Sequence, residues 1–158
     1  MRSCRRLLMV GIVLSAGIAM LSAQAASPRI GSWQLNLAKS KYSPGPAPKT
    51  QTLKIEASGE GEKVTAEITD STGARIVTGY TANYDGKDYP LSGSATADTV
   101  SLKRVSARTT ERADKKGGKP TVTYTRVVAP DGKTMTVTVK GTNAQGQPVH
   151  NVLVFEKQ

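Results

Sequence analysis

Alternation of apolar and polar residues, broken by short turns, constrains this 158-residue chain more than any other feature. In Leu53, Ile55 and Ala57 the apolar residues occupy every second position, with Lys54 and Glu56 between them. A period of two places successive side chains on opposite faces of a β-strand. The segments predicted as strands are 31–37, 53–57, 64–69, 76–84, 89–91, 100–104, 108–113, 122–128, 135–139 and 149–157.

The turns between these segments are short and contain Gly, Asp and Asn, as at Asp85-Gly86. Short connections leave no room for the crossovers that parallel strands need, so neighbouring strands are antiparallel and follow chain order. No segment has the 3.6-residue period of an amphipathic helix. A sheet of this many strands removes its edges by closing on itself. The sequence therefore predicts an all-β fold, a single antiparallel up-and-down β-barrel of about 8–10 strands.

The outward face of the predicted barrel argues against a place in a membrane. It carries Lys, Glu and Thr, and aromatic residues make up only 4% of the chain. Lipid would not tolerate such a face, and two interfacial girdles would need more aromatic residues. We therefore expect an apolar interior, a hydrated exterior and no membrane span.

The first 25 residues have the organisation of an export signal. Three arginines precede an apolar run over 7–21, and Ala23-Gln24-Ala25 matches a signal-peptidase site. The run is too short to be a strong membrane span of about 20 residues. We expect residues 1–25 to be a signal peptide, with Ala26 as the alternative last residue. Residues 26–158 then form one barrel domain in the periplasm or outside the cell.

The charge of the chain is strongly basic. The net charge of +10 falls to +7 once the three arginines of the signal are removed. The basic residues are scattered, and their tightest cluster is 115–119, which is typical of a solvated surface. The alternative is a weak attraction to anionic polymers. Nucleic acid is not an expected partner, because the chain has one Phe, one Trp and no basic–aromatic interleaving.

The two ends of the predicted domain resemble a known family. Gly31-Ser32-Trp33 begins the first strand, and the last strand ends Val154-Phe155-Glu156-Lys157. In a single barrel of this size these ends resemble the calycins, namely the lipocalins and fatty-acid-binding proteins. The resemblance implies a lipocalin-like barrel in which Trp33 is buried and seals the closed end. The opening over 31–42, with its Pro-Gly-Pro loop, also resembles a group of small exported bacterial proteins of unassigned function.

The departures from the fatty-acid-binding proteins concern the ligand. Two short helices cover the barrel mouth in that family, whereas the Pro-rich stretch 43–48 cannot be helical here. Their last strand offers an Arg and a Tyr to the ligand carboxylate, and Leu153 and Phe155 occupy those places. The resemblance therefore implies an interior ligand without implying a fatty acid.

No constellation for catalysis or metal binding is present in the sequence. His150 is the only His, and Cys4, the only Cys, lies in the predicted signal peptide. A zinc site needs several such ligands, and Asp85, Asp88 and Asp98 lack the spacing of a calcium loop. We expect neither an enzyme nor a bound metal or cofactor.

Two arginines are predicted to point into the barrel. Arg104 follows Leu102, and Arg126 follows Tyr124, each at a period of two. One interpretation is that each guanidinium reaches solvent at a strand end or packs on Trp33. The other is an internal clamp for an anion, because a buried Arg requires a partner.

Small inward residues favour a cavity over a solid core. Those predicted to face inward are Ala57, Ala66, Thr78 and Ala82. We expect a pocket at the end opposite Trp33, under the loop 44–48, and a monomer that binds a small lipophilic or amphipathic molecule. The candidate ligand-binding residues are Tyr80, Tyr84, Tyr124, Arg126, Leu153 and Phe155, with Arg126 favouring an anionic head group. The alternative is a structural or interaction module of the cell envelope, with a packed barrel and a basic surface for polyanions.

Overall fold

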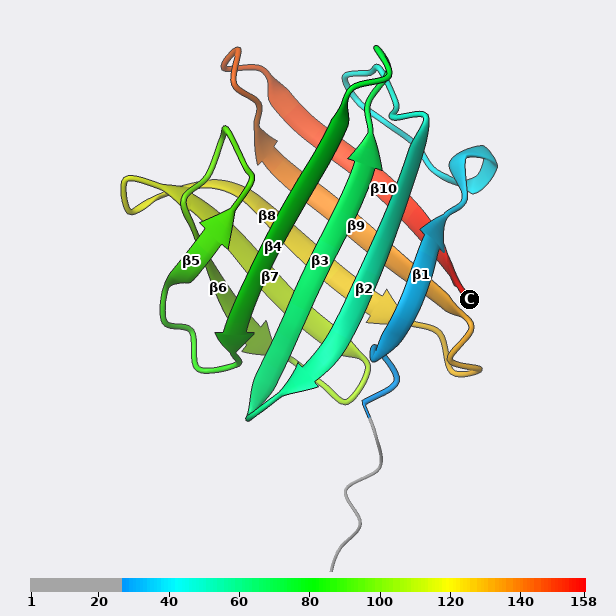
Figure 1. Ribbon diagram of the computed structural model, residues 1–158, viewed down its shortest axis with the longest axis vertical. Coiled ribbons are helices and arrows are strands. Elements are labelled where there is room, and N and C mark those ends of the chain that lie inside the picture. Colours follow the sequence, from blue (N-terminus) through cyan, green and yellow to red (C-terminus); the bar gives the residue numbers. More distant parts are fainter. Residues whose placement is uncertain (1–26) are drawn as a thin grey trace, which may run out of the picture.

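The alternating segments form ten antiparallel strands in a computed structural model that describes residues 27–158 (Figure 1). The predicted signal peptide, residues 1–25, lies outside the described residues, as do Cys4 and Ala26. The strands are β1 (Gly31–Leu35), β2 (Thr50–Ser58), β3 (Gly61–Thr69), β4 (Arg75–Asn83), β5 (Tyr89–Ser92), β6 (Thr99–Arg104), β7 (Thr109–Lys116), β8 (Lys119–Val128), β9 (Thr134–Thr142) and β10 (Pro148–Lys157).

The sheet closes because β1 pairs with both β2 and β10. In the closing register Trp33 lies opposite Lys157 and Leu35 lies opposite Phe155. Every other strand pairs with its neighbours in chain order, so the barrel is a simple meander. Figure 1 shows β1–β4 in front of β7–β10, whose strands cross them behind the interior. The prediction of an all-β, antiparallel up-and-down barrel is confirmed, with ten strands.

Helical structure plays little part in the described chain. Residues 27–158 contain the short 3-10 helix η1 (Leu37–Lys39). In that part of the chain no helix has the length and apolar character needed to cross a membrane.

Trp33 packs the end of the barrel where β1 begins. Its side chain is fully buried, and its indole Nε1 donates a hydrogen bond of 2.8 Å to the carbonyl oxygen of Arg29. The ammonium of Lys157 lies 5.2 Å from the centre of the ring. The cation beside Trp33 is therefore Lys157, rather than the Arg104 or Arg126 that the sequence suggested.

The barrel geometry decides between the two interpretations of Arg104 and corrects two other expectations. Arg104 is exposed, as the first interpretation had it, because β6 ends there, and its guanidinium lies 4.5 Å from the centre of the Tyr84 ring. Ala57 is exposed near the end of β2. The strand predicted over 108–113 runs instead over Thr109–Lys116.

Replacement of Trp33 tests its role as the closing side chain. Trp33→Ala should lower the free energy of unfolding by about 3–5 kcal/mol, because a large apolar group leaves a packed site. Trp33→Phe keeps most of the apolar body and should lose much less. Urea unfolding followed by circular dichroism measures both. An unchanged midpoint for Trp33→Ala would show that the side chain does not support the core.

Candidate functional site

A cavity of about 210 Å³ lies inside the barrel, in the half away from Trp33. Because strands alternate in direction, the end of β1 and the starts of β2 and β4 share one rim, opposite the rim at which Trp33 lies. Apolar side chains from five strands form most of the wall: Leu53, Val64, Leu91, Val137, Leu153 and Phe155. The small residues Ala66 and Thr78 face the same space and leave it unfilled.

The loop after β5 lines the outer part of the cavity with Ser94 and Thr96. Gly93 begins this loop with φ = +75°, and a Cβ there would meet the carbonyl oxygen of Val77 at 1.9 Å, so only glycine fits. Ala97 is 2% exposed and anchors the other end of the loop in the core. The loop therefore lies close against β4 and beside the cavity.

The Pro-rich loop does not have the position predicted for it. The chain that leads into this loop runs alongside β10. There the backbone N–H of Lys41 donates to the carbonyl of Val152 at 2.7 Å, and that of Ser43 donates to Asn151 Oδ1 at 2.8 Å. Prolines 44, 46 and 48 are absent from the cavity lining, and Ser94 and Thr96 line it instead. The expectation of a pocket under residues 44–48 is thus corrected.

A buried ion pair crosses the interior beside the cavity. Glu62 on β3 is fully buried and Arg126 on β8 is 4% exposed. Arg126 Nη2 donates to Glu62 Oε1 at 2.5 Å, and the two other guanidinium nitrogens donate to Thr110 Oγ1 at 3.1 Å and to the Tyr80 hydroxyl at 3.4 Å. All three nitrogens of Arg126 therefore have partners within the protein. The expected anion clamp at Arg126 is corrected, because its charge is already compensated.

Tyrosine hydroxyls complete the shell of Glu62. The Tyr80 hydroxyl donates to Glu62 Oε1 at 2.8 Å, and the Tyr84 hydroxyl donates to Glu62 Oε2. Tyr84 also accepts a hydrogen bond of 3.3 Å from Nη2 of the buried Arg29. This network joins the segment before β1 to β3 and, through Arg126, to β8. A buried charge needs such a complete set of partners to persist.

A second charged pair lies on β7. Arg112 and Asp114 are two residues apart, so both face inward. Arg112 Nε donates to Asp114 Oδ1 at 2.5 Å, and Nη2 donates to Oδ2 at 2.8 Å. The rings of Tyr80 and Tyr124 lie 4.8 Å and 4.6 Å from the guanidinium carbon. Arg112, Asp114, Tyr124 and Arg126 supply the charged and aromatic polar groups of the cavity lining.

The ionisation of these groups follows from burial and charge. Burial raises the pKa of Glu62, but the Arg126 cation and the hydrogen bonds from Tyr84, Arg126 and Tyr80 outweigh it, so the pKa lies below its usual value. Burial raises the pKa of Tyr124 to about 12; the Arg112 cation lowers it in part and Asp114 raises it further. Near neutral pH Glu62 is therefore ionised and Tyr124 is neutral.

The structure separates the predicted ligand-binding residues into two groups. Tyr124, Arg126, Leu153 and Phe155 line the cavity. Tyr80 and Tyr84 do not line it, because their hydroxyls are directed to Glu62. Their contribution to the cavity is therefore indirect, through the positions of charged side chains.

Sequence reasoning missed Glu62, Arg112 and Asp114. The signal for Glu62 was its place two residues before Val64, on the inward face, although it adjoins a turn. Arg112 and Asp114 also occupy alternate positions, on either side of Ala113. However, β7 is so polar that its sequence does not show which face is the inward one. A charged residue on an inward position was the available signal in each case.

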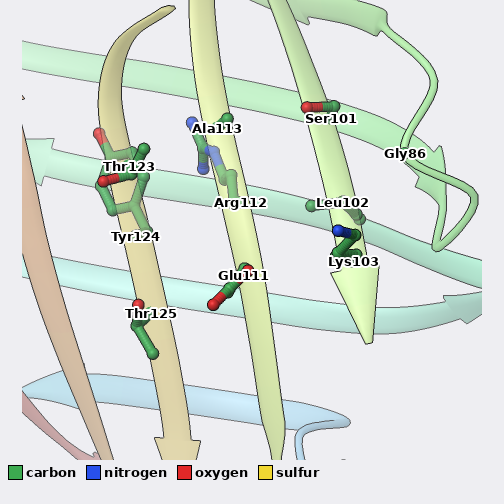
Figure 2. A pocket seen from close by; sticks show the side chains of 10 residues that line it. All are labelled: Gly86, Ser101, Leu102, Lys103, Glu111, Arg112, Ala113, Thr123, Tyr124 and Thr125. Carbon is green, nitrogen blue, oxygen red and sulfur yellow. The ribbon is translucent and has the colours of Figure 1, made fainter. Parts of the chain in front are cut away.

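A wider hollow of about 440 Å³ lies on the outer face of β6, β7 and β8 (Figure 2). Its outward side chains are Ser101, Lys103, Glu111, Ala113, Thr123 and Thr125. Lys103, Glu111 and Thr123 are exposed, so water reaches this outer groove freely. The interior cavity is smaller, but more of its lining side chains are buried, which strengthens polar contacts within it. No cluster of His, Cys, Asp and Glu suited to a metal ion occurs within residues 27–158.

No protein-family model matches the chain, and no curated protein matches it in sequence. Among solved structures it is similar to the zebrafish ileal bile acid-binding protein complexed with cholic acid, with 12% identity, a TM-score of 0.48, and coverage of 84% of this chain and 100% of that chain. It is also similar to the siderocalin Ex-FABP, with 12% identity, a TM-score of 0.39, and coverage of 84% and 75%. Likenesses this weak carry no inference about function.

The pKa of Glu62 makes stability depend on pH. Because its folded pKa is below the unfolded value of about 4.3, its stabilising effect is complete above that value and is lost as the pH falls through the folded pKa. The urea concentration at the unfolding midpoint should therefore decrease as the pH is lowered below about 4. In the double variant Glu62→Leu/Arg126→Met the fall in this range should be shallower, because the pair is replaced by apolar groups. If the urea midpoint decreased equally steeply with falling pH in the two proteins, the pH dependence would not come from Glu62.

Proposed function

We propose that this protein is an exported, non-enzymatic barrel that binds a small amphipathic molecule in its interior. The observation that carries the proposal is the cavity beside the Arg112–Asp114 and Glu62–Arg126 pairs, with Leu91, Val137 and Leu153 in its apolar wall. Mostly apolar walls with a few fixed polar groups are typical of small-molecule sites.

The size of the cavity limits the ligand. An engineered cavity of about 150 Å³ holds benzene, and drug-sized ligands occupy pockets of about 300–1,000 Å³. At about 210 Å³ the interior suits a molecule with on the order of ten non-hydrogen atoms. A long-chain fatty acid would not fit without displacement of the wall. A ligand this small binds with a Kd between roughly millimolar and micromolar.

Two features argue against the alternative of a packed barrel with a polyanion-binding surface. The interior is not filled, as described above. Several surface cations also have acidic partners: Lys115 lies 2.5 Å from Asp88, and Arg75 lies 2.8 Å from Glu67. Interspersed charges of both signs weaken the single-sign field that a polyanion needs.

The hydrogen-bond partners of the buried carboxylates support a protein without catalytic activity. Glu62 is bound by Arg126 and two tyrosine hydroxyls, and Asp114 is bound by Arg112. A general base needs a pKa near the working pH and a free face toward the substrate. The lowered pKa and occupied oxygens of Glu62 do not meet this need.

Export is part of the proposal and has its own test. It is motivated by the three arginines, the apolar run over 7–21 and Ala23-Gln24-Ala25. Mass spectrometry of the protein from its host should find a chain that starts at Ala26 or Ser27. A full-length chain that starts at Met1 and remains in the cytoplasm would contradict export.

Ligand binding is tested with 2-heptanone, a water-soluble amphipathic ketone of suitable size. Saturable chemical-shift changes should appear on the methyl groups of Leu91, Val137 and Leu153 in NMR titrations. Ala66→Leu fills the cavity and should weaken binding at least about tenfold, because the ligand loses its space. The matched control is Ala113→Leu, which places the same bulk in the outer groove and should leave binding unchanged.

The two variants also separate the alternatives. A loss of binding in Ala113→Leu but not in Ala66→Leu would move the site to the outer groove. No saturable shift at any concentration would favour a packed, structural barrel. Circular dichroism spectra of both variants serve as the control for folding.

A further inference from the structure

We infer that the Arg112–Asp114 pair selects the head group of the ligand, and that it favours an uncharged hydrogen-bond acceptor over a carboxylate. The head group of the ligand would then be a ketone or amide carbonyl. This inference rests on the proposed function, because it assigns the polar contact within the same cavity. It differs from a carboxylate clamp, in which a free cation meets an anionic head.

Arg112 is held in one orientation. Its Nε and Nη2 atoms are taken by the two oxygens of Asp114, at 2.5 Å and 2.8 Å. Tyr80 and Tyr124 lie over the guanidinium at 4.8 Å and 4.6 Å from their ring centres. A planar guanidinium that a carboxylate binds through two nitrogens, and that packs against two aromatic rings, cannot turn to meet a ligand. Its remaining N–H groups therefore point in a set direction.

One guanidinium nitrogen of Arg112 is available. Among residues 27–158 its Nη1 atom has no hydrogen-bond partner, and it is not one of the buried polar atoms left without one. The side chain of Arg112 remains 15% exposed, whereas that of Arg126 is 5% exposed. Because Arg112 lines the cavity, its free nitrogen can donate to an acceptor atom within that space.

The surrounding charges decide which acceptor is favoured. Asp114 compensates Arg112, and Glu62 compensates Arg126, so the two guanidiniums that line the cavity bring no net charge with their partners. The third buried cation, Arg29, does not line the cavity. A bound carboxylate would lose its hydration and face Asp114 without a free positive charge to offset either effect. A carbonyl oxygen accepts from Arg112 without these penalties.

The test compares two probes with equal numbers of non-hydrogen atoms, 2-heptanone and hexanoate, by NMR titration at pH 7.5. The parent protein should bind the ketone at least about tenfold more tightly, because a buried charge without a partner is strongly disfavoured. Equal affinities, or tighter binding of hexanoate, would overturn the inference. If Ala66→Leu weakens binding in either of these two cases, the proposed function still holds.

Asp114→Asn is the decisive variant, because it removes one charge and keeps the size and an acceptor oxygen. Arg112 then carries an uncompensated charge, and hexanoate should gain about tenfold or more while the ketone changes by less than about threefold. An unchanged ratio of the two affinities would overturn the inference. No saturable binding of either probe to the parent would overturn both this inference and the proposed function.

A second variant keeps the inference testable if Asp114→Asn does not fold. Arg112→Met/Asp114→Leu replaces the pair with apolar groups of similar size, which proteins commonly tolerate. The ketone should then bind several-fold more weakly, since its donor is gone. Unchanged ketone binding would show that Arg112 does not contact the head group.

Discussion

The ion pair between Glu62 and Arg126 is the contact on which the interior depends. It joins β3 to β8, strands that are not neighbours in the sheet, and so it spans the barrel. Taking both charges out of water costs several kcal/mol for each ion, and the hydrogen bonds from Tyr80 and Tyr84 and to Thr110 offset this cost. Loss of one partner would leave a buried charge, at a cost of about 3–5 kcal/mol.

The interior of the barrel has two unlike halves. Toward the start of β1 the side chains of Trp33, Leu102, Val128 and Met135 are almost fully buried and pack closely. Toward the other rim the inward residues are smaller or hold their polar groups in pairs, and a cavity of about 210 Å³ remains. The packed half supplies stability, and the hollow half is the part of the molecule free to bind.

Paired charges also change what kind of ligand the interior suits. Three arginines are buried or nearly so, which at first suggests an anion site. Two of them are neutralised by carboxylates of the same chain, and the third lies away from the cavity. The remaining recognition is by direction of hydrogen bonds instead of by net charge. Such a site distinguishes ligands by whether they accept a hydrogen bond in the right place.

The fold could be predicted because its signal is local. A period of two and short turns are visible within each segment, and Trp33 stands at the start of the first strand. The charged pairs could not be predicted, since Glu62 and Arg126 are 64 residues apart and meet only when the barrel closes. Arg104 shows the converse difficulty: it has the same spacing as Arg126, but its strand ends there, so it is exposed. Alternation indicates a face, whereas the depth along the barrel depends on the register of all ten strands.

A crystal structure of the protein grown with 2-heptanone tests the central claim most directly, namely that a binding cavity remains inside the barrel in the half away from Trp33. The account predicts one molecule among Leu91, Val137 and Leu153, with its carbonyl oxygen within hydrogen-bond distance of Arg112 and the Glu62–Arg126 pair intact. A barrel filled throughout by its own side chains would contradict it. So would a ligand found only in the outer groove over Ala113.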